Sequence, residues 1–172
     1  MVLVVLVSLG GVAWAGEYYL SDNDAYWWYW DGQPNYEVLI PSAAFAYVQL
    51  DWGGTSSLEV ALDQDGPLLI IGTLPGTDVN RAWNALSARY SAAVTNARTT
   101  TDSTIETEMG LQARFKVLEG SSQGGPDALV RMVAFVRDGR TAFLMFVGNK
   151  RDYAGNAQQY WLRAVHSFNW RS

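Results

Sequence analysis

The chain has 172 residues, the length of one domain, and its composition of 49% hydrophobic and 17% charged residues excludes intrinsic disorder. Twelve basic and seventeen acidic residues give a net charge of −5, so the sequence lacks the basic surface that would bind a nucleic-acid backbone. The chain contains no cysteine, which excludes disulfides, thiolate metal ligands and a cysteine nucleophile.

Residues 1–15 form an uncharged, largely apolar segment that ends in Ala13-Trp14-Ala15. Small residues at the first and third of these positions match the A-x-A site of signal peptidase, although no basic residue follows Met1. We expect a secretory signal at 1–15 and a single α+β domain at 16–172, exported to the periplasm or outside the cell. A buried strand or helix of the folded domain is the alternative for this segment. No apolar stretch is long enough to predict a stable membrane span.

The next region predicts an aromatic hairpin over residues 26–40. Tyr26 to Trp30 is a run of bulky rings with strand preference. The sequence Asp31-Gly32-Gln33-Pro34-Asn35 has turn chemistry, and Tyr36 to Ile40 is the predicted return strand, closed by Pro41. Further strands are predicted at 45–50, 58–62 and 68–71, and the continuous apolar run of the last indicates burial on both faces.

Two helices are predicted in the second half. The first begins at Thr77 or Asp78 and carries an apolar stripe from Val79 to Val94, and the last one, with Asp152 as its expected cap, carries a stripe from Ala157 to Phe168. Between them, Thr104 to Leu118 predicts a long strand or a kinked pair with a bend at Gly110, and a loop follows from Glu119 to Asp127. Asp138-Gly139 predicts a hairpin turn between two apolar strands.

This order of elements predicts an α+β fold: an antiparallel β-sheet built from hairpins, with two amphipathic helices packed on it. The segments 110–115, 129–147 and 160–168, together with Tyr36 to Pro41, resemble the PsbP-like fold over about residues 36–170. The resemblance implies a small exported binding or assembly module without shared catalytic residues. Its relatives include the extrinsic photosystem II protein, bacterial lipoproteins, a nuclear-import factor and chaperones that hold hydrophobic helices. Because no cysteine follows the signal segment, lipid anchoring is not expected.

Candidate chemical groups are few. His166 is the only histidine, so neither a triad nor a two-histidine zinc site is expected around it, and a structural or surface role is favoured. The sequences Asp22-Asn23-Asp24 and Asp63-Gln64-Asp65-Gly66 are fragments of a calcium loop, and turn chemistry explains both. Asp22, Asp24, Asp31 and Asp51 lie near aromatic residues, but no pair stands out for glycoside hydrolysis. We therefore expect no catalytic residue, metal ligand or cofactor.

The aromatic cluster is the one anomaly of composition. On a strand, Trp27 and Tyr29 point to one face and Tyr26, Trp28 and Trp30 to the other. The second set is the candidate binding surface, although a hairpin that buries both sets is an equal alternative.

We accordingly predict a non-catalytic exported binding or assembly module whose partner is another protein. The alternatives are a carbohydrate-binding module that uses the same rings, a small carboxylate-dependent hydrolase and a structural subunit of a surface assembly. We also expect a basic stripe on one face of the sheet, formed by Arg114, Lys116, Arg131, Arg137 and Arg140. This stripe is either an ordinary solvated face or a contact surface for an anionic partner.

Overall fold

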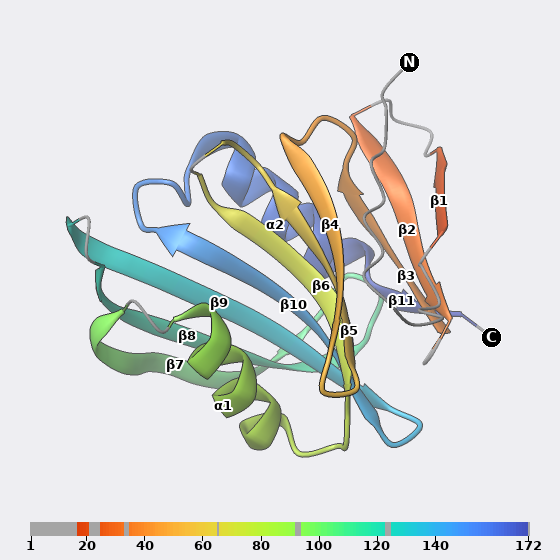
Figure 1. Cartoon of the computed structure of the whole chain (residues 1–172). Helices are drawn as coiled ribbons and strands as arrows, with labels where there is room; N and C mark the ends of the chain where they lie inside the picture. The colour runs from red at the N-terminus through yellow and green to blue at the C-terminus, as the bar shows by residue number, and fades with distance from the viewer. Residues whose placement is uncertain are drawn as a thin grey trace.

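The structure is a computed structural model that describes residues 17–20, 25–32, 35–64, 66–91, 94–122 and 125–171. Its two helices and antiparallel strands confirm the α+β class (Figure 1). The expected signal segment 1–15 lies outside the described residues. The elements are β1 (Glu17–Leu20), β2 (Tyr26–Gly32), β3 (Asn35–Pro41), β4 (Ala46–Trp52), β5 (Thr55–Ala61), β6 (Leu68–Pro75), α1 (Val79–Tyr90), β7 (Thr95–Glu106), β8 (Gln112–Ser122), β9 (Gly125–Arg137), β10 (Arg140–Asn149), α2 (Gly155–Ser167) and β11 (Asn169–Trp170).

The strands form two sheets rather than one. Seven strands pair in the order β4-β5-β6-β10-β9-β8-β7, and four pair in the order β1-β2-β3-β11. The predicted aromatic hairpin is present as the β2–β3 pair, with Trp28 opposite Leu39. The last two strand residues, Asn169 and Trp170, join this small sheet by pairing with β3.

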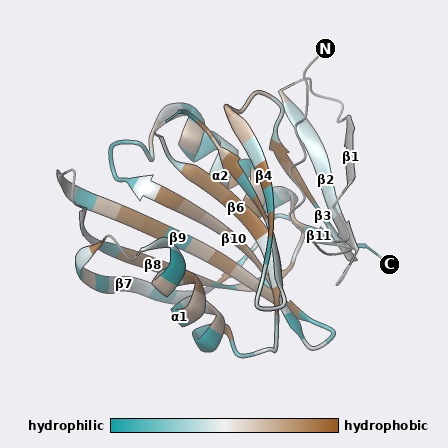
Figure 2. Ribbon diagram, viewed as in Figure 1, coloured by the Kyte–Doolittle hydropathy of each residue, from teal (hydrophilic) through white to brown (hydrophobic). Residues whose placement is uncertain are grey.

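The seven-stranded sheet has an apolar core on each face. One core cluster contains Leu144 of β10 and Val133 of β9 together with residues of α2 and the small sheet. The other contains their sequence neighbours Met145 and Met132 together with α1. Strand alternation explains this division, because successive side chains point to opposite faces. Figure 2 shows the hydrophobic colour concentrated on β6, β10 and β9. Side chains on both faces of these strands are buried, as the apolar run at residues 68–71 predicted for β6.

Stacked aromatic rings join the small sheet to the large one. The ring of Phe168 lies 3.9 Å from that of Phe135 on β9 and 5.3 Å from that of Tyr36 on β3. Tyr29 on β2 is fully buried and contacts Tyr36 at a ring distance of 6.3 Å. This apolar contact fixes the orientation of the β2–β3 hairpin against the core.

The two helices differ in how they begin. Asp78 caps α1 as predicted, and its Oδ1 accepts hydrogen bonds from the backbone N–H groups of Asn80 and Arg81. The expected cap of α2 is wrong, since the N-cap position is Ala154 and has no side-chain hydrogen bond. Asp152 instead accepts hydrogen bonds from the backbone and side-chain nitrogens of Asn149, which closes the turn before the helix.

Residues 95–122 form two strands where the sequence predicted one long strand or a kinked pair after a fading helix. The polar segment that begins at Thr95 is β7, the edge strand of the large sheet, and Gly110 lies in the turn to β8 at φ +72°. The predicted loop from Glu119 to Asp127 is shorter, because β8 continues to Ser122 and β9 begins at Gly125. Among the described residues, neither helix is long and apolar enough to cross a membrane.

Candidate functional site

The small sheet presents an aromatic outer face. Tyr29 is fully buried and Trp27 packs against the core, so alternation places Tyr26, Trp28 and Trp30 on the opposite face of β2. All three of these rings are partly exposed. We call the surface formed by Tyr26, Trp28 and Trp30 the aromatic face. Tyr29 and Trp27 are thus on one side of β2, as the sequence predicted for this pair of rings.

Contacts from the C-terminal part of the chain fix the two ends of the aromatic face. The ring of Tyr26 lies 6.0 Å from that of Tyr160 on α2 in an edge-to-face arrangement, and the guanidinium of Arg163 lies 5.9 Å from the Tyr26 ring. At the other end, the guanidinium of Arg171 lies 5.4 Å from the Trp30 ring. These are cation–π distances, so each end of the face carries a positive charge beside a ring.

Glu37 adds a negative charge to the same end as Trp30. Its position in β3 is opposite Trp30, and its Oε2 lies 3.6 Å from Nε of Arg171. Leu39, opposite Trp28, is 5% exposed, so the middle of the face has a buried apolar base. The site therefore has aromatic rings in the middle and an ion pair at one edge. Sequence reasoning missed Tyr160, Arg163 and Arg171 because they are more than one hundred positions from β2.

The inner rings of the hairpin hold the aromatic face in place. Trp27 stacks on Tyr47 of β4 at a ring distance of 5.6 Å, and the Tyr47 hydroxyl donates a hydrogen bond of 2.6 Å to the carbonyl oxygen of Pro41. Burial raises the pKa of Tyr47 to about 12, so the hydroxyl remains a donor at neutral pH. On the other edge of the hairpin, the backbone N–H of Leu39 donates to Oγ of Ser167. The surface is thus attached to a rigid support on both sides.

The other candidate residues do not come together with this face or with one another. His166 is partly exposed near the end of α2, with Nδ1 3.7 Å from a carboxylate oxygen of Glu108. Asp31 is in β2 of the small sheet and Asp51 in β4 of the large one, whereas Asp22 and Asp24 lie outside the described residues. Within the described ranges, no group of three or more His, Asp or Glu residues could hold a metal ion.

The expected basic stripe is wrong. Lys116 is on the α1 face of β8, where it and Arg114 both bind Asp102. Arg131 is opposite Val117 in the sheet and therefore lies on the other face. Arg140 donates hydrogen bonds to the Gly54 carbonyl and the Thr73 hydroxyl near the β9–β10 turn. Alternation in the sequence predicts which residues of one strand share a face. The register between two strands decides whether residues of both strands lie on the same face of the sheet.

Comparisons with known proteins define the fold. No protein-family model matches the chain, and no curated protein sequence matches it significantly. The solution structure of cyanobacterial PsbP (CyanoP) from Synechocystis sp. PCC 6803 is similar, with a TM-score of 0.57 and 11% sequence identity over 96% of this chain and 99% of that chain. The chain therefore has a PsbP-like fold, as the sequence resemblance implied. At this identity the similarity concerns the fold alone.

Proposed function

We propose that this protein is a non-catalytic, exported binding or assembly module that contacts another protein through the aromatic face. The proposal rests on one observation: Tyr26, Trp28 and Trp30 are partly exposed, whereas Tyr29 and Trp27 of the same strand pack against the core. Trp and Tyr are enriched at protein interfaces, where a rigid ring provides contact area at little cost in conformational entropy. Export is supported by the signal-like pattern of residues 1–15.

The charges beside the rings favour a protein partner over a neutral glycan. Arg163 and Arg171 lie beside Tyr26 and Trp30, and Glu37 lies beside Arg171. An apolar centre with charged groups at its edge is the usual composition of a protein–protein interface. A neutral sugar could stack on the rings but would make no charge-complementary contact with Arg163, Arg171 or Glu37, whereas a protein partner can carry charges that complement them.

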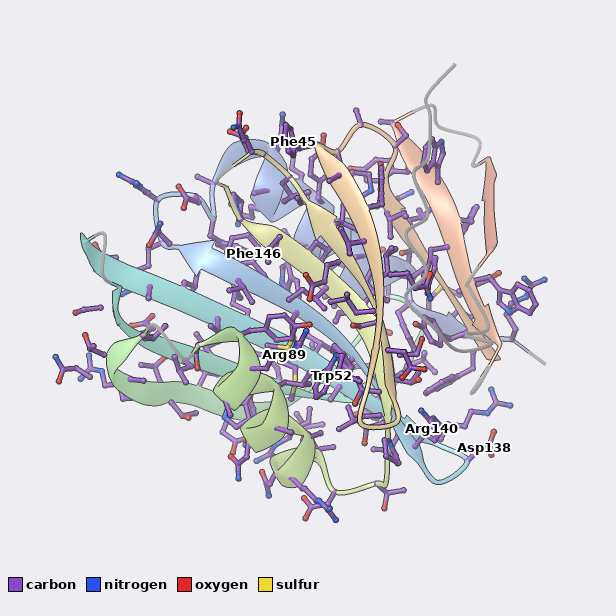
Figure 3. The ribbon with its side chains drawn as sticks, in the orientation of Figure 1. Phe45, Trp52, Arg89, Asp138, Arg140 and Phe146 are labelled. Carbon is purple, nitrogen blue, oxygen red and sulfur yellow. The ribbon has the colours of Figure 1, made fainter. Side chains whose placement is uncertain are left out.

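Site-specific photo-cross-linking tests the proposal. p-Benzoylphenylalanine replaces Trp30 in one variant and Phe45 in a matched control, and both variants are irradiated in the cells that naturally produce the protein. Phe45 directly precedes β4 of the other sheet and is 61% exposed, so it reports non-specific collisions of an exposed ring (Figure 3).

A discrete protein adduct is expected from position 30 and not from position 45. A periodate-sensitive, heterogeneous adduct at position 30 would instead identify a glycan and would overturn the choice of partner. Equal adducts at both positions, or none at position 30, would contradict the proposal that the aromatic face is the contact surface.

A further inference from the structure

The structure contains a cavity that is separate from the aromatic face. Its volume is about 360 Å³, within the range of small-molecule sites, and its walls come from β7, β8, β9 and the turn before α2. These strands lie toward the β7 edge of the large sheet, away from its β4 edge, and the cavity is on the face that α2 and the small sheet also cover (Figure 1). The floor is apolar, since Val117 and Leu129 are 7% and 6% exposed and belong to the core.

Arg131 is the chemically distinctive residue of this cavity. Its guanidinium carbon lies 4.3 Å from the ring centre of Tyr153 and 5.1 Å from that of Phe115. Nε of Arg131 is buried and has no hydrogen-bond partner, and no described residue forms an ion pair with this side chain. Two rings therefore hold the guanidinium in place while its buried Nε–H donor has no acceptor.

The remaining charges of the cavity cancel. Nζ of Lys150 lies 3.0 Å from Oε2 of Glu119, and both side chains line the cavity. Arg131 is therefore the surplus positive charge, in a protein whose net charge is −5. Burial raises the pKa of Tyr153, against the opposing effect of Arg131, so its hydroxyl stays protonated and can donate a hydrogen bond. Thr100 and Thr101 of β7 also line the cavity.

We infer that this cavity binds a carboxylate that carries a short apolar group, with the carboxylate on Arg131 and the apolar group on Val117 and Leu129. The planar fork of an arginine matches the two oxygens of a carboxylate, and this pairing would give the buried Nε–H of Arg131 the acceptor that it lacks in the protein. The fixed position of the guanidinium reduces the entropy lost on binding. A free organic acid and the C-terminus of a peptide share this chemistry.

Titration of the ¹⁵N-labelled protein with defined probes tests the site. The probes are benzoate, N-acetylphenylalanine as the mimic of a peptide C-terminus, and the uncharged amide of each acid. Backbone amide shifts of Thr101, Val117 and Leu129 are followed by NMR. Saturable shifts are expected with at least one acid. The amide of that acid should bind at least about tenfold more weakly, because it cannot form the charge-assisted pair with Arg131. Tighter binding of benzoate indicates a free organic acid, whereas tighter binding of N-acetylphenylalanine indicates a peptide end.

Two variants complete the test. Arg131→Gln should weaken binding of the preferred acid by about tenfold or more. Arg137→Gln is the matched control, because its guanidinium also lies over a ring, that of Trp170, but outside the cavity, and it should bind as the wild type does. The comparison of acid with amide on the wild-type protein requires no variant and remains decisive if Arg131→Gln fails to fold. The inference is overturned by the absence of saturable shifts, by equal binding of acid and amide, or by unchanged binding to folded Arg131→Gln.

Discussion

Replacing Asp102 with asparagine should destabilise the protein by about 2 kcal/mol, because the change leaves a buried ammonium without its counter-ion. Nζ of Lys116 lies 2.6 Å from Oδ2 of Asp102, and the Lys116 side chain is only 5% exposed. Removing one partner of a fully buried ion pair costs about 3–5 kcal/mol. The expected cost here is lower because Asp102 is 37% exposed, and because an asparagine oxygen can still accept a hydrogen bond from Lys116.

The effect should depend on pH. Hydrogen bonds from Arg114 and then from Lys116 hold the pKa of Asp102 below its ordinary value of 3.8. A carboxyl whose pKa is lowered by folding contributes stability above its unfolded pKa and loses that contribution as the pH falls through its folded pKa. The difference in unfolding free energy between the wild type and Asp102→Asn should therefore be constant near neutral pH and shrink below pH 3.8.

Urea denaturation monitored by tryptophan fluorescence measures both quantities. Glu106→Gln is the matched control: it is the same acid-to-amide change on the same strand, where the carboxylate accepts an exposed hydrogen bond from Gln112. The control should change the unfolding free energy by less than about 0.5 kcal/mol. If Asp102→Asn costs no more than the control, or if its cost is the same at pH 3 and pH 7, the assignment of a stabilising buried pair is refuted.

Three further predictions concern the fold. Gly72→Ala should lower the unfolding free energy by about 2 kcal/mol or more in denaturant titration, because its new Cβ would collide with the Ser56 carbonyl oxygen; an unchanged midpoint would contradict this close approach. Asp78→Ala should cost about 1 kcal/mol through loss of the α1 cap, and a thermal melt identical to that of the wild type would show that the cap contributes nothing. Burial raises the pKa of Tyr47 and Tyr90 to about 12, so stability should fall between pH 10 and 12, and Tyr47→Phe should reduce the decline; equal pH profiles would argue against the Tyr47 shift.

Local patterns predicted the elements that have a strong period or a specific turn. The α1 stripe follows a helical repeat and Asp78 supplies the cap, and both features depend only on neighbouring residues. The greater part of β7, residues 95–103, was not predicted because an edge strand with few buried side chains shows no apolar alternation, and most of the residues of β7 are exposed. Propensity and pattern carry little information for such a strand, whose pairing with β8 decides its structure.

Contacts between residues far apart in the chain determine features of the fold that local sequence patterns did not predict. The alternation of residues in the β2–β3 hairpin predicted that one of its faces could be buried. It did not predict that Phe168 covers Tyr36 on this face, because the two residues are far apart in the chain. The same limitation applies to the candidate sites. Tyr29 and Trp27 lie on the core side of β2, as alternation predicted for this pair, whereas the position of Arg131 over Tyr153 depends on the packing of the turn before α2 against the sheet.

The affinity of the protein for the partner captured by cross-linking at position 30 tests the role of the aromatic face most directly. Calorimetry would compare the wild type with Trp30→Ala and with Phe45→Ala, after circular dichroism shows that both variants are folded. Loss of an interface tryptophan should weaken binding by about tenfold or more, which is about 1.4 kcal/mol, while Phe45→Ala should bind as the wild type does. Equal affinities for all three proteins would contradict the account.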